Sequence, residues 1–183
     1  MKREVEIKIA TPSAASARAL LRRNGFRLDK RRVFESNVLY DTADQALRTR
    51  SQLLRLRRAG AKAVLTYKGA PEEGPHKSRE ELEFSIGSAE TAASVFERLG
   101  LKPYFRYEKY RTEYRRAREP GHVTVDETPI GVHLELEGPP AWIDRTARRL
   151  GFGREDYITA SYGALYLQAC AARGLPPGDM VFT

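Results

Sequence analysis

Apolar and charged residues alternate along eight segments of the chain. Alternation with a period of two places successive side chains on opposite faces of a β-strand. The alternating segments are 2–9, 30–40, 52–59, 62–69, 78–86, 104–116, 122–127 and 130–137. Eight short strands separated by turn residues predict a largely antiparallel barrel or sandwich.

Four other segments space their apolar residues at i, i+3, i+4 and i+7, which predicts amphipathic helices. They are 13–24, 88–99, 141–150 and 160–173. The last is the clearest, because Tyr162, Leu165, Tyr166 and Ala169 form one apolar stripe. Cys170 continues that stripe, so we expect it to pack in the core. The mixture of many strands and few helices predicts an α+β fold.

Two segments follow neither spacing. Residues 70–77 hold two prolines and a glycine between two predicted strands, which indicates a loop. Residues 174–183 are typical of a poorly ordered terminus or of a strap laid over the surface. We therefore expect a single domain over residues 1–173, followed by a C-terminal tail over residues 174–183.

Composition narrows the kinds of function that are compatible with the chain. Its 183 residues hold 32 Lys and Arg against 24 Asp and Glu, a net charge of +8 that favours an anionic partner. One cysteine and three histidines exclude a disulfide framework and any metal site built from thiolates or imidazoles. Without a long apolar stretch or an apolar segment after the first basic residues, we expect a soluble, cytoplasmic protein with no membrane partner.

Charged residues concentrate on one face of nearly every predicted strand. In segment 2–9, for example, Glu4, Glu6 and Lys8 share a face opposite Val5 and Ile7. Ser, Thr, Gln and Asn are rare on these faces. The faces together hold seven bases, Lys8, Arg55, Arg57, Lys68, Arg79, Lys109 and Arg111, and seven acids, Glu4, Glu6, Glu81, Glu83, Asp126, Glu135 and Glu137.

These charged faces have two interpretations. Each could be the solvated side of a half-buried antiparallel sheet. In the alternative, the barrel has its charged side inside and its apolar side covered by the four helices. So many charges in one interior require each other, metal ions or a charged ligand. Carboxylates holding Mg²⁺ or Mn²⁺ opposite bases that bind phosphate would suit metal-assisted chemistry at phosphorus.

The order of these residues along the chain resembles the CYTH superfamily, the triphosphate tunnel metalloenzymes. Residues 4–8 match its ExExK signature. The later matches are Arg55-x-Arg57, Thr66-Tyr67-Lys68-Gly69, Arg79-Glu80-Glu81-x-Glu83, Lys109-x-Arg111, Asp126, Glu135-x-Glu137-Gly138 and Ser161-Tyr162. The resemblance runs from residue 4 to about residue 167 and implies an eight-stranded antiparallel tunnel with a charged interior.

The resemblance also implies roles for single residues. Glu4, Glu6, Glu135 and Glu137 would form the acidic metal patches for Mg²⁺ or Mn²⁺, with Glu81, Glu83 and Asp126 as auxiliary members. The seven bases named above would contact the triphosphate. Glu4, Glu6 and Lys8 would be catalytic, with Lys8 activating water in hydrolytic members. One departure is Glu108, which precedes Lys109 where the family has a base and leaves the reach of this strand's phosphate contacts open.

Two classes of function follow. An enzyme acting on a linear triphosphate would be a class IV adenylate cyclase, which converts ATP to cyclic AMP and pyrophosphate and is favoured by the patterns TYKG, SREELEF, VDETPIG and ELEG. The alternative enzyme is a triphosphatase that hydrolyses tripolyphosphate, thiamine triphosphate or a nucleoside triphosphate. The other class is a non-catalytic binder of polyphosphate or RNA.

The binder interpretation would use a row of tyrosines as a surface on which bases stack. These are Tyr104, Tyr107, Tyr110 and Tyr114, which we instead expect to pack under the helices. Seven acids facing the bases would weaken binding of a polyanion unless a metal neutralised them, so we do not expect nucleic acid as a partner. His133 is compatible with a ligand contact or with a hydrogen bond at the mouth of the tunnel. The sequence leaves the oligomeric state open, a homodimer included.

Overall fold

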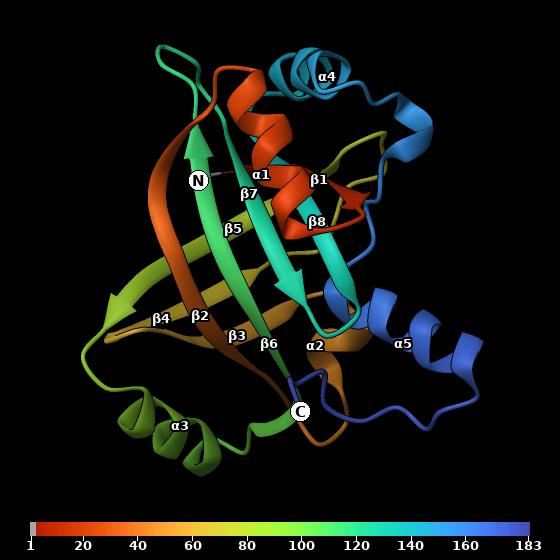
Figure 1. Cartoon of the computed structure of the whole chain (residues 1–183). Helices are drawn as coiled ribbons and strands as arrows, with labels where there is room; N and C mark the ends of the chain where they lie inside the picture. Colours follow the sequence, from red (N-terminus) through yellow and green to blue (C-terminus); the bar gives the residue numbers. More distant parts are fainter. Residues whose placement is uncertain (1–2) are drawn as a thin grey trace.

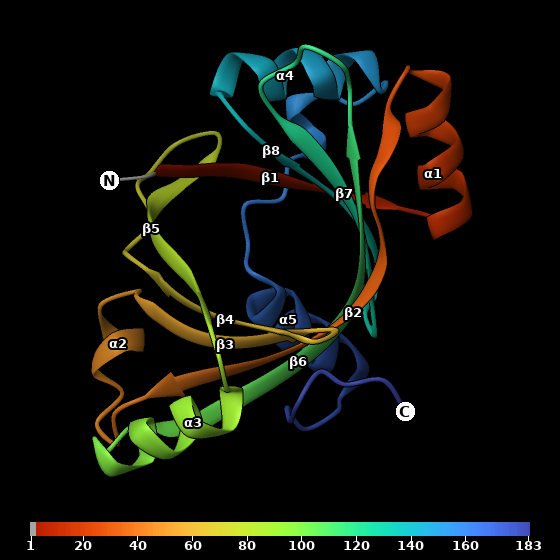
Figure 2. The same ribbon diagram turned by 90° about the vertical axis from the view of Figure 1, so that its left-hand side faces the viewer.

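The computed structural model describes residues 3–183, which form one closed antiparallel barrel of eight strands (Figures 1 and 2). The strands are β1 (Arg3–Thr11), β2 (Arg27–Asp41), β3 (Leu53–Ala59), β4 (Lys62–Lys68), β5 (Lys77–Ile86), β6 (Lys102–Arg115), β7 (His122–Thr128) and β8 (Gly131–Glu137). Around the barrel their order is β1-β5-β4-β3-β2-β6-β7-β8. The predicted fold class is confirmed, although Lys2, where the first predicted strand begins, lies outside the described residues.

Five helices surround the strands, and a single 3₁₀ turn spans Arg154–Asp156. The helices are α1 (Ala14–Arg23), α2 (Ala46–Thr49), α3 (Ala89–Arg98), α4 (Pro140–Arg149) and α5 (Tyr162–Arg173). The sequence predicted four of them. It missed α2, a single turn too short to show a helical period, whose backbone is held by the carboxylate of Asp41. Within residues 3–183, no helix is long and apolar enough to cross a membrane.

The apolar core lies outside the barrel wall, between the wall and the helices. Helices α1 and α4 lie near β1, β7 and β8 (Figure 1) and bury Leu21 and Trp142 against Ile7 and Leu136. On another side, Phe96 of α3 packs with Leu56 of β3. Because the pleat sends alternate residues to opposite faces, the charged side chains on the same strands must point inward.

The helices do not cover the whole outer wall. Leu82 and Phe84 of β5 are 49 % and 57 % exposed, so part of the apolar face that we expected to lie under helices meets solvent. Single exposed apolar residues are common on protein surfaces.

The C-terminal part of the chain lies along two strand edges of the barrel. After α4, Ile158 exchanges backbone hydrogen bonds with Lys8 of β1, and the first turn of α5 then lines the interior. Beyond α5, Met180 is fully buried and pairs with β6 through the backbone of Arg106 and Glu108. The sequence was compatible with a poorly ordered terminus or with a strap laid over the surface. Residues 174–183 form the strap.

Candidate functional site

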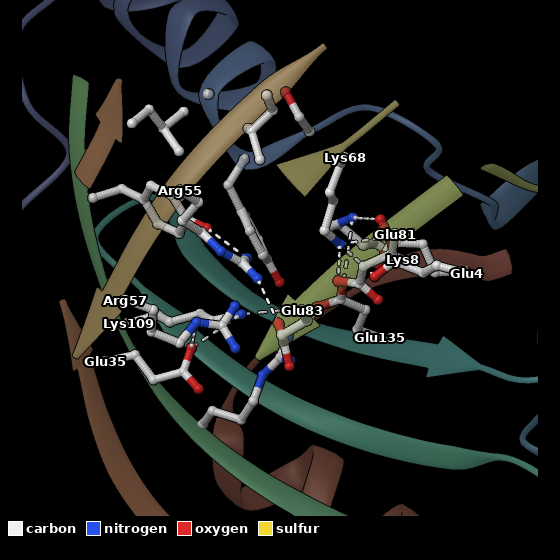
Figure 3. Close-up of a pocket in the computed structure, with 18 of the residues that line it drawn as sticks. Glu4, Lys8, Glu35, Arg55, Arg57, Lys68, Glu81, Glu83, Lys109 and Glu135 are labelled. Carbon is white, nitrogen blue, oxygen red and sulfur yellow. Dashed lines mark hydrogen bonds and ion pairs between the residues drawn. The ribbon is translucent and has the colours of Figure 1, made fainter. Parts of the chain in front are cut away.

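The barrel encloses a cavity of about 1530 Å³ that is lined by residues from all eight strands. Thirteen of the fourteen charged residues singled out in the sequence line it. The exception is Asp126, which points inward but is fully buried beneath Lys109, Arg111 and Tyr162. The structure thus decides between the two interpretations of the charged faces, because these faces meet in one interior (Figure 3).

Four carboxylates from β1 and β8 form one wall of the cavity. We call Glu4, Glu6, Glu135 and Glu137 the acidic set. In the register of the two strands, Glu6 lies opposite Glu137. Burial, together with the nearby carboxylates of Glu4 and Glu135, raises the pKa of Glu137 to about 7. Burial and the neighbouring carboxylates together therefore favour the protonated form of Glu137.

Lys8 lies among these carboxylates. Its Nζ atom is 3.1 Å from Glu6 and 3.6 Å from Glu135, and the side chain is buried. Although burial alone would lower the pKa of Lys8, the two carboxylates raise it above its ordinary value. Lys8 therefore stays an ammonium group at physiological pH and donates hydrogen bonds.

A second amine, Lys77, lies 3.0 Å from the same Oε1 atom of Glu6 that Lys8 contacts. The sequence placed Lys77 at the end of a loop, whereas it is the first residue of β5 and is buried. Burial lowers its pKa to about 8 in spite of Glu6. Its position two residues before Arg79, on the inward face, was the signal that could have identified it.

Bases from β3, β4 and β6 line the same cavity, and two of them, Lys68 and Arg111, contact the acidic set directly. We call Arg55, Arg57, Lys68, Lys109 and Arg111 the basic set. Figure 3 shows Arg55, Arg57 and Lys109 on one side of the pocket and Lys68 near Glu4 and Glu81 on the other. Lys68 contacts Glu4 and lies 3.1 Å from Glu81.

Of the remaining predicted residues, Arg79 lies 3.5 Å from Glu4, and Glu83 accepts a hydrogen bond from Arg55 at 3.3 Å. Asp126 accepts hydrogen bonds from Lys109 and Arg111, and also from the hydroxyl of Tyr162 at 2.9 Å. Asp126 thus fixes the positions of two members of the basic set, Lys109 and Arg111.

The sequence did not single out Glu35, which lies within the basic set. Its carboxylate is 3.4 Å from Arg57 and 3.7 Å from Lys109. Burial alone would raise its pKa, but Lys109 and Arg57 hold it at about 2. Two register shifts in β2 at Lys30 and Val33 interrupt the alternation just before Glu35, so its face was not readable from the sequence.

The tyrosines of β6 do not all pack under helices. Tyr114 lies in the core near α1, and Tyr110 stacks on Phe34 outside the barrel. Tyr107 and Tyr104 line the cavity, and both also pack in an apolar cluster with Tyr162 of α5, so for these two the expectation is confirmed in part. Tyr107 lies two and four residues before Lys109 and Arg111 on the same strand, so its side chain points to the same, inward face.

His133 is also buried and does not line the cavity. Its ring centroid lies 5.6 Å from that of Tyr162. Within residues 3–183 the Nδ1 atom of His133 has no hydrogen-bond partner, so the expected hydrogen bond is not seen, and the expected ligand contact stays a prediction.

The acidic set suits a hard divalent cation in charge and chemistry. Among residues 3–183, no three carboxylate, histidine or cysteine side chains converge on a metal position, because the carboxylates are turned toward Lys and Arg. However, burial and the neighbouring carboxylates raise the pKa of Glu137, and oxygen atoms are the ligands that Mg²⁺ and Mn²⁺ prefer. We infer that such a cation binds to these carboxylates once the Lys and Arg side chains that now pair with them bind phosphate oxygens instead.

The raised pKa of Glu137 predicts a pH-dependent stability. Between its ordinary pKa and about 7, the folded protein binds a proton that the unfolded chain releases, so this group makes folding less favourable as pH rises. The Glu137→Gln variant should therefore gain stability relative to the wild type from pH 4.5 to pH 7, by roughly 3 kcal/mol at most. Urea unfolding at several pH values measures this difference, and a constant difference would contradict it.

A closed antiparallel barrel whose interior is lined by acids and bases is a tunnel that suits an anionic ligand. The chain belongs to the CYTH family, because residues 2–162 match the CYTH domain. Members of this family are in general metal-dependent.

Similar proteins include a Methanocaldococcus jannaschii protein provisionally named an adenylate cyclase, which is 30 % identical over 135 residues, 73 % of this chain and 75 % of that protein. A Vibrio parahaemolyticus structure with the same provisional name has a TM-score of 0.76 and 19 % identity, over 88 % of this chain and 95 % of that one. A structure from Hippeastrum, provisionally named an adenylyl cyclase, has a TM-score of 0.67 and 21 % identity, over 97 % of this chain and 98 % of that one.

Proposed function

We propose that the protein is a divalent-metal-dependent triphosphatase that hydrolyses a linear triphosphate inside the barrel. The observation that carries the proposal is that the basic set and the acidic set line one cavity and contact each other there. Arg and Lys bind phosphate oxygens, and Arg does so with two parallel hydrogen bonds. Hydrolysis of a triphosphate depends mostly on positioning the substrate and on neutralising its charge. A cavity lined by both the basic set and the acidic set supplies both.

The residues divide these tasks. The basic set, with Arg79, would bind the phosphate oxygens, whereas the acidic set, with Glu81 and Glu83, would hold Mg²⁺ or Mn²⁺. When bound, the cation supplies charge neutralisation at the reacting phosphate. Because Lys8 stays protonated, we expect it to orient Glu6 and Glu135 and to donate a hydrogen bond, and not to take a proton from water.

Cyclisation of ATP is the second candidate. In this reaction the ribose 3′-hydroxyl attacks the α-phosphorus and pyrophosphate leaves. It is favoured by the name of the Methanocaldococcus jannaschii relative and by the apolar residues in the cavity lining, Leu39, Leu53, Phe105 and Leu167, which suit contact with an organic group. Hydrolysis is favoured by the Hippeastrum protein, which is described as having a dominant triphosphatase activity.

One incubation separates the candidates. The protein is mixed with Mg²⁺ or Mn²⁺ and, separately, with ATP, tripolyphosphate and thiamine triphosphate, and the products are resolved. Orthophosphate without cyclic AMP supports the triphosphatase. Cyclic AMP with pyrophosphate supports the cyclase. Metal-dependent binding without turnover of any of the three would instead identify a non-catalytic binder.

The proposal also predicts that anion and metal stabilise the protein together. A ligand that binds only the folded state adds about 2.7 kcal/mol at a hundredfold excess over its dissociation constant. Because the carboxylates are paired with the bases, Mg²⁺ alone should raise the melting temperature little, and tripolyphosphate with Mg²⁺ should raise it most. Thermal unfolding with each ligand alone and with both checks this. Equal shifts from tripolyphosphate and orthophosphate would indicate a generic surface site.

A further inference from the structure

The phenol of Tyr107 lies in the cavity with an unused hydrogen. The side chain is 7 % exposed, and its oxygen accepts a hydrogen bond from Nη1 of Arg55 at 3.3 Å. Among the residues that the structure describes, no oxygen accepts the hydroxyl proton in return. Buried hydroxyl groups normally donate as well as accept, so this proton is available to a ligand.

The surroundings of Tyr107 are those of an anion site. Arg55 and Arg57 of β3 and Lys109 of β6 approach it. The ring of Tyr162 on α5 has its centroid 6.5 Å away. Asn37 of β2 binds the backbone oxygen of Tyr107.

The other titratable groups packed nearby are few. Tyr104 lies on the same strand, and Glu35 of β2 is held by Arg57 and Lys109. Glu83 of β5 accepts a hydrogen bond from the other terminal nitrogen of Arg55 at 3.3 Å. Cations therefore dominate this part of the cavity.

We infer that Tyr107 is a further substrate-binding residue of this enzyme, and that its hydroxyl donates a hydrogen bond to a phosphate oxygen of the triphosphate held by Arg55. The inference rests on the proposed function. Arg55 would bind both the hydroxyl of Tyr107 and the phosphate. The hydroxyl would therefore fix the position of the Arg55 guanidinium and also of the phosphate oxygen that it binds. A phenol supplies a neutral donor in a place where a further cation would add repulsion within the basic set.

Only the neutral phenol can donate this hydrogen bond. Although burial alone would raise the pKa of Tyr107, Arg55, Arg57 and Lys109 lower it to about 8. In the free enzyme the donor is thus lost above about pH 8, and kcat/KM should fall there. Bound phosphate offsets the cations and raises the pKa of the phenol, so kcat should fall only at higher pH.

The test compares Tyr107→Phe with Tyr110→Phe. Tyr110 lies on the same strand, but its ring stacks on Phe34 and Phe182 outside the barrel, so its variant removes a phenol hydroxyl without touching the cavity. Tyr107→Phe should lower kcat/KM for tripolyphosphate about tenfold or more at pH 7, as expected for a lost hydrogen bond to a charged group. It should also remove the fall in kcat/KM above pH 8. Tyr110→Phe should match the wild type.

A fluorinated tyrosine at position 107 gives a second readout. Its phenol is more acidic, so the alkaline fall in kcat/KM should move to lower pH while the ring and its packing stay the same. A purely structural role for the hydroxyl would not move the profile. The melting temperature of each variant shows whether the barrel is intact.

Two results would overturn the inference. If the alkaline fall persists in Tyr107→Phe, it belongs to another group such as Lys77, whose pKa is also about 8. If calorimetry shows that Tyr107→Phe binds tripolyphosphate with unchanged affinity and turns it over at the wild-type rate, the hydroxyl does not contact the substrate. Failure of the proposed function looks different, because the wild type itself would then neither bind nor hydrolyse tripolyphosphate.

Discussion

Replacing Glu6 with Gln is expected to lower metal-dependent hydrolysis of tripolyphosphate about 100-fold or more while the barrel stays folded. Glu6 is buried in the acidic set, between the amines of Lys8 and Lys77. A neutral amide keeps the shape of the side chain but removes the charge that a divalent cation requires. Lys8 keeps a partner in Glu135. Lys77 loses its carboxylate partner, but its pKa is already lowered to about 8, so it can become neutral and the barrel should stay folded.

Measurement of kcat and KM across a range of Mn²⁺ concentrations checks this prediction. Glu90→Gln is the matched control, because Glu90 is an exposed acid on α3 that pairs with Arg58 outside the barrel. The control should behave as the wild type. Full activity of the wild type in excess chelator, or an unchanged metal dependence in Glu6→Gln, would refute the role of the acidic set.

Neighbouring residues on β3 should respond to truncation in opposite ways. Leu56 is 4 % exposed and packs with Tyr40 and Phe96 outside the wall. Leu56→Ala should therefore lower the free energy of unfolding by about 2–5 kcal/mol. Arg57 points into the cavity toward Glu35, which keeps a second cation in Lys109. Arg57→Ala should therefore change stability by about 1 kcal/mol or less, because no buried charge is left alone.

Ligand binding should show the reverse order. Arg57→Ala should weaken binding of tripolyphosphate about tenfold or more, whereas Leu56→Ala should leave the affinity of the folded fraction unchanged. Urea unfolding and calorimetric titration of the two variants measure both effects. If Arg57→Ala lost as much stability as Leu56→Ala and bound tripolyphosphate normally, the interior charges would be structural ion pairs and not a binding site.

Alternation within single strands was enough to predict most of the interior. Glu4, Glu6 and Lys8 occupy every second position of a regular strand, so their common face follows from geometry alone. The order of the motifs then linked strands that are far apart in the sequence. The closed barrel and the family were both predictable on this basis.

What the sequence could not predict depends on tertiary contacts. Lys77 follows a proline and a histidine, and only pairing with Glu6 of β1 makes it the first residue of a strand. Asp126 alternates like an inward residue, yet Lys109, Arg111 and Tyr162 cover it from the cavity side. Alternation with a period of two predicts which face of the strand a side chain lies on. It does not predict whether other side chains cover it and separate it from the cavity.

The pairing of β1 with β8 constrains how the protein can acquire activity during folding. These strands are the first and last of the barrel, and the acidic set consists of two residues from each. Contacts between distant parts of a chain form slowly, since a long loop must close before they contribute. Half of the acidic set is missing until β8 has left the ribosome and paired with β1. An incompletely synthesised chain therefore has bases but no complete site, and catalysis begins only when the barrel closes.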